Sequence, residues 1–223
     1  MNTVVNKPWL SRLSVPFLVL VLIAPMVSAW IVFKYYPELV RSLGTSNYGT
    51  FIVPPVKLDM DGLSQADGKP VPADVFDKKW TYVYLNKGIC DKTCFDHLML
   101  MKNVRLSQGK EISRMKRLFI TSSEVNGELD KLIKQFPNMR TVRLGNDKQE
   151  NDIRALFSSK DQPDPFVSHS IYIIDPDAKL MMHYKDDRKD KTTTGLAKED
   201  IIQLGKGMQD DMSKLMKNSK LRK

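Results

Sequence analysis

Apolar residues are most concentrated in one uninterrupted run close to the N-terminus. Residues 15–33 read VPFLVLVLIAPMVSAWIVF and include no charged side chain. Because a helix of about 20 apolar residues spans the hydrocarbon core of a bilayer, the run predicts a single N-terminal transmembrane helix. We place this anchor at residues 15–36, after a cytoplasmic N-terminus of residues 1–14. Lys7 and Arg12 precede the run, and positive charge on that side favours an N-terminus inside the cell.

A cleaved signal peptide is the alternative interpretation of the same run. The small residues Val27, Ser28 and Ala29 resemble a cleavage site after an apolar stretch. The run nevertheless continues to Phe33, beyond that site, as an uncleaved anchor does. Both interpretations export the rest of the chain. The favoured one predicts a single-pass protein of the inner membrane, with its C-terminal domain in the bacterial periplasm or the mitochondrial intermembrane space.

Residues 37–72 carry turn-forming pairs in place of a periodic apolar pattern. Pro54-Pro55, Asp61-Gly62 and Asp67-Gly68 are typical of loops. This composition predicts a linker that can include a hairpin at its end. The folded domain is therefore expected at residues 73–223.

Strand-like and helix-like patterns alternate through this expected domain. Lys79 to Leu85 is rich in β-forming residues and predicts a strand that ends just before Cys90. The apolar spacing after Cys90 predicts a helix that ends near Gln108. The other expected elements are strands at 117–121 and 141–144, helices at 125–136 and 152–157, a hairpin of 170–174 with 180–184, and a last helix across 201–215. A βαβ unit followed by a ββα unit predicts an α/β domain with the thioredoxin-like fold.

Composition and charge narrow the possible partners. The 223 residues are 42% hydrophobic and 27% charged, which suits one folded domain beside an anchor. The formal net charge is +9, but the lysines and arginines are scattered and accompany no nucleic-acid-binding motif. We therefore expect no nucleic-acid partner. The positive charge instead suits a domain that lies beside anionic lipid or docks on an acidic protein.

The chain contains only two cysteines, Cys90 and Cys94. The expected elements place Cys90 in the loop before a helix and Cys94 in its first turn, so the sulfurs come within disulfide reach. The amides and partial positive charge of a helix N-terminus favour the thiolate, which attacks disulfides and binds soft metals. Lys92 adds to this effect and Asp91 opposes it. We therefore predict that both cysteines are catalytic and are candidate Cu(I) ligands; a structural disulfide, or two buried cysteines, is the alternative.

Three segments carry a family resemblance. Gly88-Ile89-Cys90-Asp91-Lys92-Thr93-Cys94 has a C-x-x-x-C pair after a strand, and Val167-Ser168-His169-Ser170 precedes a strand and the turn Asp175-Pro176-Asp177. Both resemble segments of the Sco/SenC family, membrane-anchored thioredoxin-like proteins that assist copper insertion into cytochrome c oxidase. The proline that this family has close to its cysteines is absent here. Asn47-Tyr48-Gly49-Thr50 resembles a shorter bacterial Sco-like group associated with haem-copper oxidase genes.

The resemblance implies a site and partners. It implies that Cys90, Cys94 and His169 hold Cu(I), and that the partners are the inner membrane and the copper-site subunit of cytochrome c oxidase or other oxidase assembly factors. From the residues alone, His169 is either a copper ligand or a polar residue at a strand entrance. His97, on the expected helix, is interpreted as solvated, and His183 as structural or exposed.

Three functions are open at this point. The preferred one is an oxidase assembly factor that binds Cu(I), reduces disulfides at the oxidase copper site, or does both. The second is a general periplasmic thiol-disulfide oxidoreductase that does not use copper, in which one thiolate attacks a substrate disulfide and the other resolves the mixed disulfide. The third is a non-catalytic interaction module with a structural disulfide.

Overall fold

The chain divides into two compact units, Met1–Ser46 and Asn47–Lys223. The computed structural model describes residues 8–36, 47–60, 69–72, 74–76, 78–122, 127–158, 164–186 and 195–220. The expected cytoplasmic N-terminus, the linker and the helix at 125–136 each extend partly outside these ranges.

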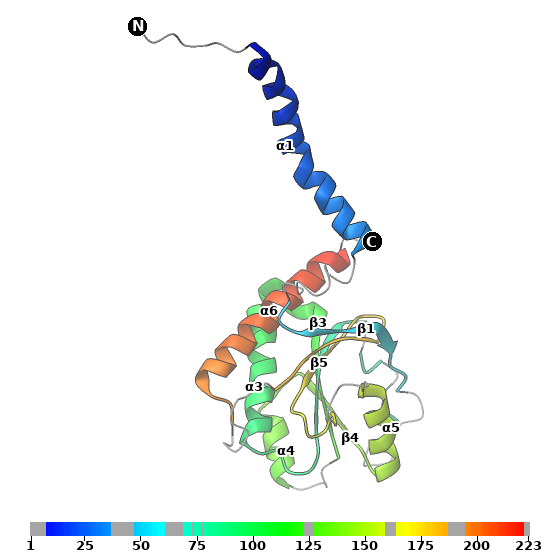
Figure 1. Ribbon diagram of the computed structural model, residues 1–223. Helices are drawn as coiled ribbons and strands as arrows, with labels where there is room; N and C mark the ends of the chain where they lie inside the picture. Colours follow the sequence, from blue (N-terminus) through cyan, green and yellow to red (C-terminus); the bar gives the residue numbers. More distant parts are fainter. Residues whose placement is uncertain are drawn as a thin grey trace. The chain divides into compact units, whose positions relative to one another are not determined.

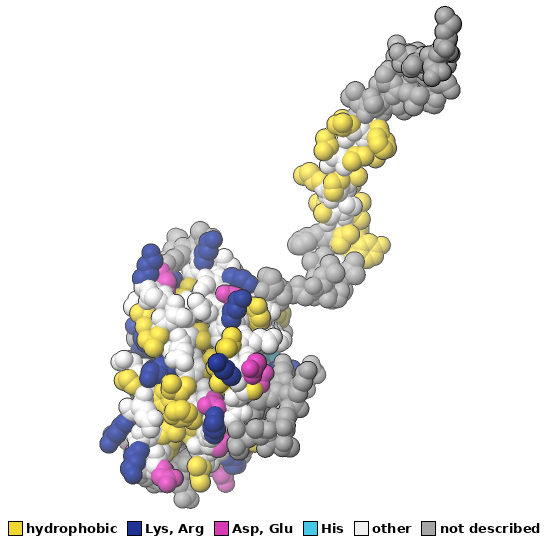
Figure 2. Space-filling view, turned by 90° about the vertical axis from the view of Figure 1, so that its left-hand side faces the viewer, with side chains coloured by type: hydrophobic (Ala, Val, Ile, Leu, Met, Phe, Trp, Pro, Cys, Tyr) yellow, Lys and Arg dark blue, Asp and Glu magenta, His cyan; other side chains and the backbone are white. Residues whose placement is uncertain are grey.

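The described part of the first unit is one helix, α1 (Pro8–Tyr35). Most of its described apolar side chains are exposed (Figure 2), and Phe17, Leu22 and Met26 have 68%, 68% and 78% of their surface exposed. Among the residues that the structure describes, no helix is both long enough and apolar enough to cross a membrane. The anchor at 15–36 therefore stays a prediction.

The second unit is built on a six-stranded sheet with the strand order β1-β6-β5-β2-β3-β4. The strands are β1 (Thr50–Lys57), β2 (Trp80–Asn86), β3 (Met115–Thr121), β4 (Met139–Arg143), β5 (Ile171–Ile174) and β6 (Lys179–Tyr184). Strands β2, β3 and β4 are parallel, whereas β5 is antiparallel to β2 and to β6, and β1 is antiparallel to β6. The sheet therefore joins a parallel half to an antiparallel half at the β2–β5 pair.

Helices cover both faces of this sheet (Figure 1). They are α3 (Lys92–Ser107), the short 3-10 helix η1 (Gly109–Arg114), α4 (Gly127–Lys134), α5 (Asp147–Phe157) and α6 (Lys198–Lys220). Apolar side chains of α3, α4 and α6 share one core cluster with Tyr82 and Tyr84. Those of α5 share the other cluster with Val83 and Leu85. Every residue of β2 is buried because alternate side chains of this strand enter opposite cores.

The predicted α/β thioredoxin-like fold is confirmed, together with the strand, cysteine turn and helix at its centre. The helix expected at 152–157 begins earlier, at Asp147. The reason is an N-cap: the Asn146 side chain accepts a hydrogen bond from the backbone N–H of Gln149 at 2.9 Å. The cap starts the helix inside a polar stretch, where no apolar periodicity marks it.

The expected linker at 37–72 is wrong in its described part, and so is the domain start at residue 73. Strand β1 lies inside that range and pairs with β6, and Leu58 and Met60 are buried in the core. Pro54-Pro55 does not exclude a strand here, because proline is tolerated where an edge strand has no ladder partner for its missing N–H. The pairing register between β1 and β6 shifts between Phe51 and Val56, the stretch that contains these prolines. The compact unit begins at Asn47.

A buried carboxylate ties this segment to the C-terminal helix. Asp211 of α6 is fully buried, and its Oδ2 accepts hydrogen bonds from the backbone N–H groups of Tyr48 and Gly49, each at 2.9 Å. Gly49 has no room for a side chain, because a Cβ there would lie 2.7 Å from the Sδ of Met182. Tyr48 and Gly49, which directly precede β1, are therefore packed against the rest of the domain.

Candidate functional site

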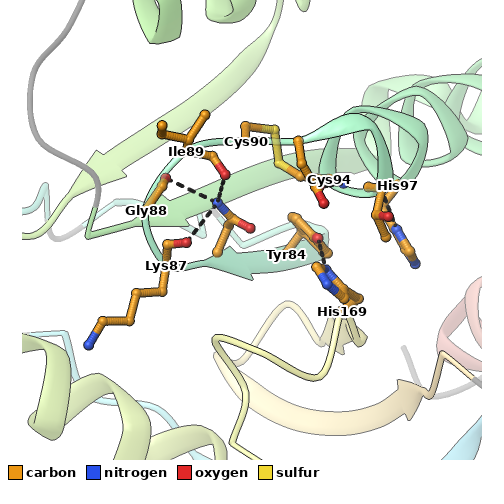
Figure 3. The surroundings of a disulfide bond; sticks show 11 residues. Tyr84, Lys87, Gly88, Ile89, Cys90, Cys94, His97 and His169 are labelled. Carbon is orange, nitrogen blue, oxygen red and sulfur yellow. Dashed lines mark hydrogen bonds between the residues drawn. A yellow bond between two sulfur atoms is a disulfide. The ribbon is translucent and has the colours of Figure 1, made fainter. Parts of the chain in front are cut away.

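A disulfide bond joins Cys90 and Cys94 at the start of α3 (Figure 3). Their Cα atoms are 5.2 Å apart, which confirms the expected pairing across the strand-to-helix turn. Cys94 is fully buried in the core cluster, whereas Cys90 is only partly buried at its edge. The two sulfurs therefore differ in how easily another molecule can reach them.

The loop before Cys90 is shaped from within by one buried side chain. The amide nitrogen of Asn86 donates to the carbonyl oxygens of Lys87, Gly88 and Ile89 at 3.5, 3.3 and 3.5 Å (Figure 3). Gly88 has φ +75°, a left-handed conformation that glycine adopts without steric cost. The loop thus bends around the Asn86 side chain, and this bend places Cys90 just before the first turn of α3.

The charges beside the cysteines are engaged in the first turn of the helix. The carboxylate of Asp91 caps α3 by accepting the backbone N–H of Cys94 at 2.8 Å. Lys92 donates to Asp96 at 2.7 Å, one turn further on. The helix start therefore carries a carboxylate at the N–H of Cys94 and a lysine that is already paired, so much of the activating charge expected from Lys92 is neutralised.

Three rings form a cluster beside Cys94: Tyr84 of β2, His97 of α3 and His169 from the turn before β5. The centroid of Tyr84 lies 5.3 Å from that of His97 and 6.4 Å from that of His169, and the two imidazole centroids are 5.9 Å apart. All three planes are within 20° of parallel. The Tyr84 hydroxyl and the Nδ1 atom of His169 are hydrogen-bonded at 2.8 Å (Figure 3).

Sheet topology brings His169 to the edge where the cysteine pair lies. Strand β5 runs antiparallel to β2, with Ile171 opposite Tyr84, so the start of β5 meets the end of β2. His169 itself has φ +52°, an uncommon conformation for a residue with a side chain. This conformation is held by the protein around it, and such backbone outliers are frequent at functional sites.

His97 differs from its expected solvated position: it is fully buried. Its Nδ1 lies 2.8 Å from the carbonyl oxygen of Thr93, and because a carbonyl only accepts, Nδ1 carries the proton. The signal that could have revealed this is its place beside Leu98 and Met101, both fully buried, on the sheet-facing side of α3. The structural interpretation of His183 is confirmed, since it is buried on β6 with its ring 6.2 Å from that of Tyr172.

The site as it stands is an oxidised one. Within the described ranges, no three or more His, Cys, Asp or Glu side chains are grouped as a metal-binding set. Copper ligation by the cysteines requires the disulfide to be reduced first, because the thiolate is the soft ligand. A metal ion on His169 would bind its Nε2, since Nδ1 is held by Tyr84. A hydrogen bond on the other ring nitrogen is the usual arrangement for a metal-binding histidine.

Comparison with known proteins supports the fold. Residues 80–219 match the family model described as transmembrane-like, thioredoxin-like, C-terminal domain. No curated protein sequence is a significant match. Among solved structures, apo Sco1 from Thermus thermophilus is similar with a TM-score of 0.53 at 16% identity, over 76% of this chain and 97% of that one.

Two further structures have lower scores. ScoI with copper bound, from Bradyrhizobium japonicum, has a TM-score of 0.43 at 17% identity and covers 60% of this chain and 89% of its own. The thioredoxin domain of a thiol-disulfide oxidoreductase from Bacteroides vulgatus has a TM-score of 0.45 at 13% identity, over 77% and 99%. The structural neighbours thus include Sco/SenC proteins, and at these identities the likeness concerns the fold.

Proposed function

Because the chain belongs to the transmembrane-like, thioredoxin-like family, we propose that it is a Sco-like factor for cytochrome c oxidase assembly, anchored in the inner membrane by α1 with its domain in the periplasm. It binds Cu(I), reduces the cysteines of the oxidase copper site, or does both. The observation that carries this proposal is the Cys90–Cys94 pair at the mouth of α3, with His169, which is hydrogen-bonded to Tyr84, at the same edge of the sheet. The choice of the oxidase copper-site subunit as the client protein rests on the sequence resemblance to Sco/SenC proteins.

The reducing step follows from the unequal burial of the two sulfurs. The Cys90 thiolate, which is the more accessible, attacks one sulfur of the client disulfide and displaces the other as a thiolate. The buried Cys94 thiolate then attacks Cys90, which closes the internal disulfide and releases the second client thiolate. The client gains two electrons and takes two protons from water. An external dithiol protein must reduce the Cys90–Cys94 bond before the next cycle.

Copper binding uses the same reduced pair. Two thiolates one helical turn apart can hold Cu(I), and the imidazole of His169 supplies a third ligand. Tyr84 orients that ring through its hydrogen bond to Nδ1. Copper is the cargo here, so its affinity has to permit transfer to the client.

We expect the reduced full-length chain in detergent to bind about one Cu(I), and the oxidised chain to bind none, because the two thiolates are the soft ligands of the proposed site. Competition with a chromophoric Cu(I) chelator measures the affinity. His169→Ala should weaken it, and His183→Ala, which removes a histidine held on β6 against Tyr172, is the matched control. A reduced chain that takes up no Cu(I) contradicts the copper role and leaves disulfide reduction as the function.

Tyr84→Phe should weaken Cu(I) binding by about 10- to 100-fold, which is the usual cost of removing a group that orients a metal ligand. The substitution keeps the buried ring that stacks on both histidines and removes only the hydroxyl that contacts His169. The effect should vanish when His169 is already alanine. If Tyr84→Phe weakens binding equally in both backgrounds, the hydroxyl does not act through His169.

A general thiol-disulfide oxidoreductase is the second candidate. It is favoured by the disulfide itself, with one sulfur buried and the other at the surface, which is the arrangement of a redox pair. The two functions differ in copper binding and in the client.

A further inference from the structure

Helix α5 lies on the face of the sheet opposite α3 and carries an ion pair, Glu150 with Arg154, that the proposed chemistry does not use. Glu150 is almost completely buried, with 4% of its surface exposed, and Arg154 follows one turn later. The two form an ion pair and a hydrogen bond along the helix. A buried carboxylate is costly unless it is paired, so its partners define its role.

The first partner belongs to the cysteine side of the site. The Nζ of Lys87, in the loop that leads to Cys90, donates to Oε1 of Glu150 at 2.8 Å. Burial by itself raises the pKa of the Glu150 carboxyl, but the hydrogen bonds from Lys87 and Arg154 outweigh it and hold that pKa below its ordinary value. Glu150 is therefore charged at neutral pH. Its ion pair with Lys87 connects the cysteine loop to α5, on the face of the sheet opposite α3.

The second partner of Glu150 is Arg154, which connects it to the turn that carries His169. The Nε of Arg154 donates to Oδ2 of Asp164 at 3.0 Å, and the guanidinium lies 5.6 Å from the ring centroid of Phe166. Asp164 in turn organises the turn that leads to His169. Its Oδ1 accepts the N–H of Phe166 at 3.0 Å, and its carbonyl accepts the N–H groups of Val167 and Ser168 at 3.1 and 2.9 Å.

Together these contacts form a continuous charged chain, the α5 bridge, made of Lys87, Glu150, Arg154 and Asp164. Its charges alternate in sign, and the members at its ends lie in the two loops that carry Cys90 and His169. Those loops are far apart in sequence, and near the site the Tyr84 hydrogen bond ties His169 to β2, the strand that leads into the cysteine loop. The bridge adds a second connection between them, from the opposite face of the sheet.

We propose that the α5 bridge sets the position of the cysteine loop relative to His169, so that Glu150 and Arg154 are positioning residues of the redox and copper site. This inference rests on the proposed function only for its copper readout. A metal site tolerates little displacement of its ligands, so a loop that shifts when the bridge is broken loses affinity even if every ligand is present.

The test uses variants that break the bridge at one end or in the middle. Lys87→Gln releases only the cysteine loop, Asp164→Asn only the histidine turn, and Arg154→Gln disconnects both halves. We expect the NMR signals of the Cys90 amide to move in Lys87→Gln, those of the His169 ring in Asp164→Asn, and both sets in Arg154→Gln. Arg140→Gln is the matched control, because it breaks the ion pair with Asp74, which takes no part in the bridge.

The copper readout separates positioning from stability. Arg154→Gln should lower Cu(I) affinity by about 10-fold, in the range for groups that support metal ligands, and this loss should disappear in a His169→Ala background. Arg154→Lys, which can still pair with Glu150 but lacks the planar fork that also reaches Asp164, should restore only part of it.

Two outcomes overturn the inference, and one bears only on the function. If Arg154→Gln leaves both the Cys90 and the His169 signals unchanged, the bridge positions neither loop, whether or not the chain binds copper. If Arg140→Gln produces the same shifts and the same loss of affinity, the effect is general destabilisation. If the wild-type chain binds no Cu(I) but the one-sided shifts occur, the positioning role stands and the copper function fails.

Discussion

Cys90→Ser is expected to abolish Cu(I) binding by the reduced chain and to stop disulfide reduction. The variant removes one of the two thiolates and the only sulfur of the pair that lies at the surface. Serine is a hard oxygen ligand of nearly the same size, so the loss reports on the sulfur and not on packing. Copper-to-protein ratios after removal of excess metal measure the first loss, and reduction of a disulfide peptide measures the second.

The companion variant, Cys94→Ser, separates the two roles of the pair. With Cys90 intact but no resolving thiol, the mixed disulfide with a client should accumulate, and it can be identified by mass spectrometry. Ile89→Ser is the control, since this residue is 74% exposed in the same loop and carries no sulfur. If a variant that lacks both cysteines still supports oxidase assembly in cells, the protein acts as an interaction module, and the redox and copper proposal fails.

Asp211→Ala should lower the free energy of unfolding by about 3 kcal/mol or more, because it takes away the acceptor that three donors share. Three donors share its Oδ2: the backbone N–H groups of Tyr48 and Gly49, and the hydroxyl of Tyr184 at 3.1 Å. Each would be left in a buried or half-buried place without this acceptor, at about 1 to 3 kcal/mol when no substitute is found. Urea unfolding followed by tryptophan fluorescence gives the value.

Partial variants make this prediction specific. Tyr184→Phe removes one of the three donors and should cost about 1 kcal/mol. Gly207 also belongs to this contact, since a Cβ there would come within 2.6 Å of the Tyr48 Cβ. Hydrogen exchange should show residues 47–49 released in Asp211→Ala while β2 and β3 stay protected. A loss below about 1 kcal/mol would mean that solvent replaces the three bonds without penalty.

Local patterns were enough to predict the centre of the fold and the cysteine pair. Strand β2, the turn at Cys90 and helix α3 are encoded within a short stretch, where β-forming residues, a glycine turn and helical spacing follow one another. The sulfurs of Cys90 and Cys94 were expected within disulfide reach because the two residues are four positions apart across the start of one helix. The hairpin of β5 and β6 was predictable for the same reason, since its turn and both strands are adjacent in the chain.

Tertiary structure alone decided the rest of the site and the edge of the sheet. Tyr84 and His169 are 85 positions apart, and only the antiparallel pairing of β2 with β5 makes them neighbours. His97 is buried because the sheet covers its face of α3; Leu98 and Met101 mark that face as apolar, but the sequence does not say what covers it. Strand β1 exists through pairing with β6, although its Pro54-Pro55 is typical of a loop. Sequence patterns report short-range preferences, whereas burial and strand pairing depend on residues that come together only when the chain folds.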